Sequence, residues 1–147
     1  MSEPSPPWTL TIPSDLRLLG VARMFIEAGC RFAELDQEAT EETILATHEA
    51  VNNIIRHAHQ DQCDVQIQIQ CRPYADGVEI CLLDEGPPFD IGAVPHLNPG
   101  ELRIGGRGVF LMRTLMDELS CEPRGDRGNA LRMVKRRFRK TAQCADA

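Results

Sequence analysis

The chain has 147 residues, of which 42% are hydrophobic and 26% are charged, and its formal net charge is -6 at pH 7. This length and composition predict one globular domain with a core of its own, and the acidic balance argues against general affinity for nucleic acid. No apolar run reaches the length of a membrane span, and the N-terminus lacks the layout of a signal peptide. We therefore expect a cytoplasmic protein that binds neither membrane nor nucleic acid directly.

Six cysteines are scattered along the chain without a C-x-x-C pair: Cys30, Cys63, Cys71, Cys81, Cys121 and Cys144. A small exported protein would use such cysteines for disulfides, but nothing in this sequence points to export. We expect reduced thiols that pack as small apolar side chains, and no structural zinc site.

The N-terminal part of the chain predicts a strand followed by a helix. Residues 1–7 are rich in Pro and Ser and are expected to be disordered, whereas residues 8–12 alternate apolar and polar side chains, as a strand does. Apolar side chains then recur at helical spacing. Ser14 is the expected N-cap of this helix and Gly29 its expected end.

A second helix and a hairpin are predicted next. The helix begins at Asp36 or Glu38, with Asp36 or Thr40 as its cap, and ends at Ala58. After residue 62 the period changes from helical to two. Two alternating or apolar segments, residues 65–71 and 78–83, flank a turn and predict antiparallel strands, of which the second is the more central.

The polar residues of the second helix have an unusual arrangement. Glu49, Asn53 and His57 recur every four positions, so a helix stacks them on one face, roughly opposite an apolar stripe. A solvated face usually carries Lys and Glu, whereas this one offers a carboxylate, an amide and an imidazole. The stretch is therefore either a plain amphipathic helix or the wall of a site.

The C-terminal part begins with a long Gly- and Pro-rich loop at residues 84–106, which is typical of a lid or binding segment. A helix from about Gly108 and strands at residues 119–123 and 129–138 follow.

Six bases gather near the end of the chain: Arg132, Lys135, Arg136, Arg137, Arg139 and Lys140. They could form a patch that binds phosphate or nucleic acid. They could also be the solvated face of a last strand whose charge prevents edge-to-edge pairing, and this second interpretation is favoured.

Two further clusters could carry chemistry. One is the segment Asp84-Glu85-Gly86-Pro87-Pro88-Phe89-Asp90, directly after an apolar strand, where a glycine would let backbone approach a ligand. The other is Gly105-Gly106-Arg107-Gly108 before a helix, where exposed amides and the helix dipole suit phosphate. Each alone also fits an ordinary loop. No G-x-x-x-x-G-K-[ST] motif is present, and the glycine cluster lacks the preceding strand of a dinucleotide fold.

Taken together, three segments in this order resemble the N, G1 and G2 boxes of the GHKL ATPase fold: Glu49-x-x-x-Asn53-x-x-x-His57, Asp84-x-Gly86-x-Pro88-Phe89-Asp90 and Gly105-Gly106-x-Gly108. Within that superfamily the chain is most similar to the anti-sigma-factor serine kinases of bacterial partner-switching systems. The resemblance implies an α+β fold of the GHKL (Bergerat) type, a two-layer α/β sandwich with a mixed, mostly antiparallel sheet and helices on one face. It implies a kinase domain at residues 8–140 and a flexible end at residues 141–147.

The resemblance also implies a role for each matching residue. Asn53 would ligate Mg²⁺, and Glu49 would act as general base on the attacking hydroxyl. Asp84 would accept a hydrogen bond from the adenine amino group, and Gly86 would let backbone and water approach the base. The remaining expected ATP-binding residues are His57, whose role is open between packing and ligand contact, and Gly105, Gly106 and Gly108 at the phosphates.

The sequence departs from the family pattern at two places. The basic residue expected before the glycine box, near the γ-phosphate, is either Arg103 or Arg107. Where the family often has Thr beside the glycine near the adenine site, this chain has Gly128-Asn129-Ala130.

The implied function is an ATP-dependent serine/threonine kinase and anti-sigma factor. It would sequester a sigma factor or similar regulator, phosphorylate a small anti-anti-sigma antagonist of the STAS type, and form a homodimer. The alternative is a nucleotide-binding module that sequesters a partner without significant kinase activity. A detached histidine-kinase domain is less favoured, because the 48 residues before Glu49 predict a strand and a helix and not a phosphoacceptor hairpin.

Overall fold

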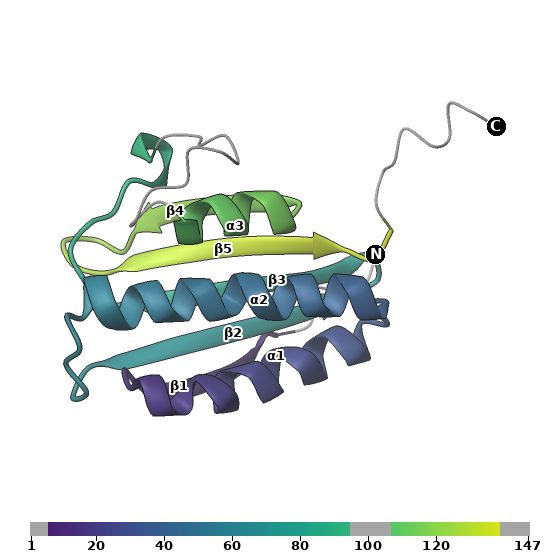
Figure 1. Cartoon of the computed structure of the whole chain (residues 1–147), viewed down its shortest axis with the longest axis horizontal. Coiled ribbons are helices and arrows are strands. Elements are labelled where there is room, and N and C mark those ends of the chain that lie inside the picture. Colours follow the sequence, from purple (N-terminus) through teal and green to yellow (C-terminus); the bar gives the residue numbers. More distant parts are fainter. Residues whose placement is uncertain (1–5, 95–106, 139–147) are drawn as a thin grey trace.

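The computed structural model describes residues 6–94 and 107–138, which form a five-stranded sheet covered by helices on one face (Figure 1). The strand order is β1-β2-β3-β5-β4, and each of the four pairings is antiparallel. The strands are β1 (Trp8–Pro13), β2 (Gln66–Tyr74), β3 (Gly77–Asp84), β4 (Glu118–Pro123) and β5 (Asn129–Arg136). The predicted hairpin is β2–β3, and β3 is the central strand, as its more continuous apolar run indicates.

Three α-helices lie on the same face of the sheet: α1 (Leu19–Phe32), α2 (Gln37–Asn53) and α3 (Arg107–Leu115) (Figure 1). A short 3-10 turn (Leu16–Leu18) precedes α1, and a π-helical turn (Ile54–Ala58) continues α2. The result is a two-layer α+β sandwich, which confirms the predicted fold class. The predicted flexible ends, residues 1–7 and 141–147, fall almost wholly outside the described residues, and residues 95–106 of the predicted lid loop fall outside them completely.

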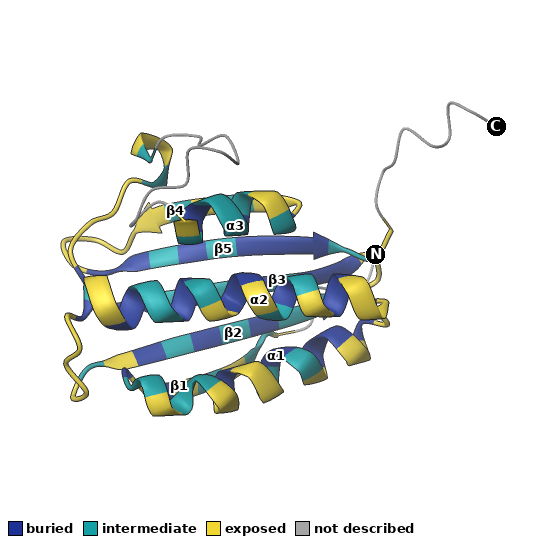
Figure 2. Ribbon diagram, viewed as in Figure 1, coloured by how far each residue is buried: buried dark blue, intermediate teal, exposed yellow. Residues whose placement is uncertain are grey.

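The core lies between the two layers (Figure 2). The sheet contributes long apolar side chains that are fully buried: Ile67, Ile69, Ile80, Leu82 and Met133. Facing them, α2 buries mainly small residues, Ala39, Thr43, Ala46 and Ala50. Small side chains let a helix approach the sheet closely, and α2 contacts α1 on one flank and α3 on the other. The helix that carries Glu49 and Asn53 is therefore the most enclosed of the three.

The start and end of the first helix differ from expectation. Asp15, not Ser14, is the N-cap of the 3-10 turn that leads into α1, because its carboxylate accepts a hydrogen bond from the Arg17 amide at 2.9 Å. Gly29 does not end α1, which continues to Phe32. Gly29 faces β2, and a Cβ at this position would overlap the Cys71 sulfur. The glycine therefore serves close packing between helix and sheet. Asp36 caps α2, as predicted.

The basic C-terminal segment is not an exposed edge. β5 lies between β3 and β4, so it needs no protection from edge pairing. Lys135 is buried, and its ammonium group donates hydrogen bonds to Glu42 Oε2 at 2.8 Å and to the Leu115 carbonyl at the end of α3. Burial of this ion pair joins α2, α3 and β5 at one point.

The other described bases are paired on the surface. Arg132 contacts Glu79 and Glu118, Arg136 contacts Glu118, and Arg137 contacts Glu34. Arg139 and Lys140 lie outside the described residues.

The five cysteines within the described ranges are free thiols. Burial raises the pKa of the Cys30 thiol to about 11 and that of Cys71 to about 12, as expected for cysteines that pack as apolar side chains. Cys144 lies outside these ranges. None of the helices described is long and apolar enough to cross a membrane.

The packing of Gly29 can be tested against a second glycine of the same helix. We expect Gly29→Ala to lower the free energy of unfolding by about 1–3 kcal/mol, because the new methyl group overlaps the Cys71 sulfur. Gly20→Ala, where no atom lies within 4 Å of the added Cβ, should be neutral or raise it by about 0.5 kcal/mol. Urea unfolding measures both. The assigned role would be contradicted if the two variants lost the same free energy of unfolding. It would also be contradicted if a Gly29→Ala/Cys71→Ala double variant recovered none of the stability that Gly29→Ala loses.

Candidate functional site

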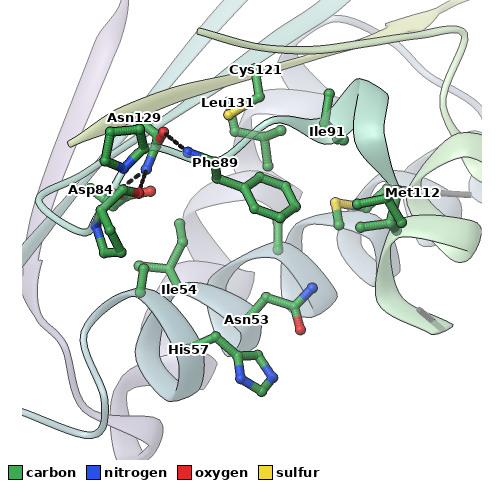
Figure 3. Close-up of a pocket in the computed structure, with 16 residues that line it drawn as sticks. Asn53, Ile54, His57, Asp84, Phe89, Ile91, Met112, Cys121, Asn129 and Leu131 are labelled. Atoms are coloured by element: carbon green, nitrogen blue, oxygen red, sulfur yellow. Dashed lines mark hydrogen bonds between the residues drawn. The ribbon is translucent and has the colours of Figure 1, made fainter. Parts of the chain in front are cut away.

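A cavity of about 420 Å³ lies between the end of α2, the loop after β3, and α3 (Figure 3). Most of its lining is apolar, including Ile54, Met112 and Leu131. Its amide, imidazole and carboxylate side chains are Asn53, His57, Asp84 and Asn129. Such a site, mainly apolar with a few polar groups, is typical of small-molecule binding.

The fold brings together residues that are distant in sequence. Asn53 and His57 lie on the α2 side of the cavity, and Asp84 lies opposite them at the end of β3 (Figure 3). Glu49 is half-buried one turn before Asn53 but is not part of the lining. Arg107 is exposed at the start of α3. Arg103, Gly105 and Gly106 lie outside the described residues.

Asp84 is buried, and two protein donors determine the orientation of its carboxylate. Its Oδ1 accepts hydrogen bonds from the Gly86 amide at 2.8 Å and from Asn129 Nδ2 at 3.1 Å. A buried carboxylate without donors would be costly, so these bonds account for its burial. Within residues 6–94 and 107–138 no hydrogen bond to Oδ2 is found, which makes Oδ2 the oxygen that a bound molecule can use.

Asn129 is the residue that the sequence analysis missed as part of the site. It lies directly across from Asp84 in the β3–β5 register, so both side chains share one face of the sheet. Besides the bond to Asp84, its amide donates to the Pro87 carbonyl at 2.8 Å and accepts from the Phe89 amide at 2.9 Å. The one available signal was that Asn stands where the resembled family often has Thr.

The turn between β4 and β5 also holds the loop after β3. Arg124 donates to the Asp84 carbonyl at 3.0 Å, Arg127 to the Glu85 carbonyl at 3.1 Å, and the Gly128 amide to the Gly86 carbonyl at 2.8 Å. Gly128 has φ +94, and a Cβ there would overlap the Asp84 carbonyl. This position requires glycine both for its backbone conformation and for the close approach.

Two glycines of the predicted site have packing roles. A Cβ on Gly86 would lie 2.6 Å from the Ala58 Cβ, and a Cβ on Gly108 would lie 2.6 Å from Asn53 Nδ2. Gly108 therefore lets the first turn of α3 lie against the Asn53 amide. The expected approach of a ligand to Gly86 stays a prediction, and the contact with Ala58 is a sufficient reason for glycine at that position.

Two histidines belong to the π-helical turn after Asn53: His57 lies within it and His59 directly follows it. His57 is exposed in the cavity, whereas His59 is buried behind the loop. The His59 ring contacts Ser14 Oγ through Nδ1 at 2.9 Å, and its Nε2 accepts a hydrogen bond from the Glu85 amide at 3.0 Å. Burial lowers the pKa of His59. Widened turns of this kind often occur at functional sites, and no sequence motif indicated His59.

A metal held by protein side chains alone is not indicated. Among the described residues, no group of three or more His, Cys, Asp or Glu side chains could hold an ion. The Asn53 amide offers one oxygen ligand of the kind that Mg²⁺ accepts, and Mg²⁺ commonly completes its shell with phosphate oxygens and water. The residues present therefore fit Mg²⁺ bound together with a phosphorylated ligand.

Comparison with known proteins identifies the family of the chain. A match to the family described as "Histidine kinase-like ATPase domain" covers residues 12–135. The chain belongs to this family. The match includes strands β2, β3 and β4, parts of β1 and β5, and every described residue of the cavity, so the cavity lies within the matched ATPase domain.

Curated relatives refine the assignment. The serine-protein kinase RsbW of Listeria innocua is 30% identical over 119 residues, which cover 76% of each chain. RsbW of Bacillus subtilis is 25% identical over 121 residues, which cover 77% of this chain and 76% of that protein. These relatives confirm the membership predicted from the three boxes, in the anti-sigma-factor kinases of the GHKL superfamily.

A solved structure agrees with the fold. The RsbU and RsbW domains of Rv1364c from Mycobacterium tuberculosis match 90% of this chain with a TM-score of 0.61 and 16% sequence identity. The present chain spans about a third of that protein, 32% of its length.

The role of Asn129 can be tested through stability. Asn129→Ala should lower the free energy of unfolding by about 2–3 kcal/mol, because it leaves the buried Asp84 carboxylate, the Pro87 carbonyl and the Phe89 amide each short of a partner. Asn52→Ala, which removes only an exposed bond to Arg56, should change it by less than about 0.5 kcal/mol. Thermal or urea unfolding compares them, and a loss as small in Asn129→Ala as in Asn52→Ala would contradict this account.

Proposed function

We propose that the chain binds ATP with Mg²⁺ in this cavity, transfers the γ-phosphate to Ser or Thr of a small antagonist protein, and acts as an anti-sigma factor. The observation that carries the proposal is the pair of polar groups across one cavity: the oriented Asp84 carboxylate on one side and Asn53, against the first turn of α3, on the other.

The adenine would lie at the Asp84 end. Asp84 Oδ2 accepts a hydrogen bond from the adenine amino group, while Oδ1 stays bonded to Gly86 and Asn129. The apolar side chains of Ile54, Met112 and Leu131 pack against the base. A pre-oriented acceptor reduces the entropy cost of binding and makes the site selective for the 6-amino group of adenine over the 6-oxo group of guanine.

The phosphates would lie at the Asn53 end. Asn53 provides an oxygen ligand for Mg²⁺, which neutralises phosphate charge when it is bound. Gly108, whose missing side chain brings α3 against Asn53, lies where backbone amides of the helix start can face phosphate. Gly105 and Gly106 are proposed as further amide donors, and Arg103 or Arg107 as the base near the γ-phosphate. His57, exposed in the cavity, is proposed as a ligand contact.

Glu49 would complete the reaction. The oxygen of the substrate hydroxyl attacks the γ-phosphorus, Glu49 takes the hydroxyl proton, and the bond between the γ-phosphorus and the bridging oxygen breaks to release ADP. Glu49 lies one helical turn before Asn53 and outside the cavity lining, where a docked protein substrate can reach it.

The partners are proposed from the relatives, which are named serine-protein kinases. A phosphate on the antagonist, of the STAS type, would weaken its docking through charge and desolvation and free the kinase to sequester a sigma factor. Exposed Val21, Met24 and Phe32 on α1 offer an apolar surface for a homodimer. A cytoplasmic location is part of the same proposal.

A second function, nucleotide-dependent sequestration without significant phosphate transfer, is favoured by one observation. Glu49 is not part of the cavity lining, so its proton-accepting role depends on how the substrate docks. A single-turnover assay with ATP and the cognate antagonist separates the two functions.

Replacing the proposed general base should separate transfer from binding. Glu49→Ala should lower phosphate transfer from labelled ATP to the antagonist by about a hundredfold or more, while the Kd for ATP changes little, because the residue acts only on the hydroxyl proton. Glu41→Ala, an exposed glutamate about two turns earlier on α2, should leave transfer unchanged. Unchanged transfer in Glu49→Ala would overturn its role.

Replacing the adenine acceptor should affect binding itself. Asp84→Asn should raise the Kd for ATP by about tenfold or more, because the amide replaces a charged acceptor. Asp76→Asn, in the exposed hairpin turn, should bind as the unmodified chain does. Isothermal titration calorimetry measures both, with ATP and with GTP. Equal losses for the two nucleotides would argue against contact between Asp84 and the base.

A further inference from the structure

Buried His59 connects three segments of the chain that are far apart in sequence. It follows the π-helical turn at the end of α2, and its ring contacts Ser14 Oγ at 2.9 Å and the Glu85 amide at 3.0 Å. Ser14 is itself fully buried just after β1, where its backbone amide donates to the Val65 carbonyl. Glu85 lies between Asp84 and Gly86, the two residues that form the turn of the adenine end.

The geometry determines the protonation state of the ring. A backbone amide can only donate, so the His59 Nε2 that faces Glu85 must be unprotonated. A neutral imidazole then carries its proton on Nδ1, which donates to Ser14 Oγ. A protonated ring would direct an N–H group at the Glu85 N–H and lose this hydrogen bond.

We propose that His59 is a positioning residue for nucleotide binding, which in its neutral form fastens the Asp84–Gly86 turn to α2 and on protonation releases it, so that affinity for adenine nucleotides falls as the pH falls. The proposal rests on ATP binding in the cavity described above. His59 touches neither the cavity nor the proposed metal ligand, and acts through the Glu85 backbone on the orientation of Asp84.

The groups around the His59 ring shift its pKa in opposite directions. Burial, the largest influence, lowers the pKa of His59 from its ordinary value of 6.5, and Arg127 in the β4–β5 turn acts in the same direction. The carboxylates of Asp84 and Glu85 act in the opposite direction. Because the pKa is lower in the folded chain, the unfolded chain takes up the proton first as the pH falls below 6.5. This group's contribution to folding stability is complete above that pH and declines below it.

The test compares the unmodified chain with His59→Gln, which keeps a side-chain acceptor but does not titrate. The Kd for Mg²⁺–ATP is measured at pH 8 and pH 5.5 by calorimetry. We expect the ratio of the Kd at pH 5.5 to the Kd at pH 8 to be about fivefold larger in the unmodified chain than in His59→Gln. This difference corresponds to the loss of about one hydrogen bond. Titration of the ATP phosphates is common to both proteins and cancels in this comparison.

Two controls address the other histidines. His48→Gln, at an exposed position of α2, should keep the pH dependence of the unmodified chain. His57 is present in every variant, so its contribution is common to all of them and cancels in the comparison. An equal pH dependence in the unmodified chain and in His59→Gln would overturn the proposal, because a merely structural histidine predicts that result.

A second measurement needs neither nucleotide nor variant. In the unmodified chain, hydrogen exchange of the Glu85 amide, corrected for the intrinsic pH dependence, should be protected at pH 7.5 and should lose at least about fivefold of that protection at pH 5.5. Unchanged protection would overturn the proposal even if His59→Gln does not fold. Absence of ATP binding at pH 8 would instead count against the proposed function, and the exchange result would still decide the role of His59.

Discussion

The structure depends on the burial of one carboxylate at the end of its central strand. Asp84 can be buried there only because the Gly86 amide and the Asn129 side chain donate to the same oxygen. Asn129 meets this need because the antiparallel β3–β5 register places it directly opposite. The same side-chain amide also forms hydrogen bonds with the backbone of Pro87 and Phe89. The residue that satisfies the buried charge therefore also determines the conformation of the loop that borders the cavity.

The central helix brings the second half of the site to this loop. α2 buries small side chains against the sheet and is flanked by α1 and α3, which leaves little freedom in its position. Gly108 lets α3 contact Asn53, and Gly86 lets the loop contact Ala58. A side chain at either glycine would overlap its neighbour, so both close contacts require glycine.

His59 shows how a site can depend on residues outside it. Its ring lies behind the loop, and it joins the end of β1 and the turn after α2 to the backbone next to Asp84. The buried imidazole makes one hydrogen bond with a hydroxyl group and one with a backbone amide. Protonation of Nε2 removes the acceptor for the amide, so a single proton breaks this arrangement. The loop is thus attached on one side by the β4–β5 turn and on the other by a titratable group.

The sequence by itself determined the class of the fold, the main strands and helices, and the cavity residues Asn53, His57 and Asp84, because periodicity and three ordered motifs depend on local spacing. Only the tertiary structure decided the rest. Gly29 has the pattern of a helix end, but in the fold it packs against Cys71, and Lys135 has the pattern of a surface base, but it pairs with Glu42. Strand register makes Asn129 part of the site, and a widened helical turn places His59 behind the loop that borders the site. Each of these roles comes from a partner at least 26 residues away in the chain, as for His59 and Glu85, and no local pattern encodes such a partner.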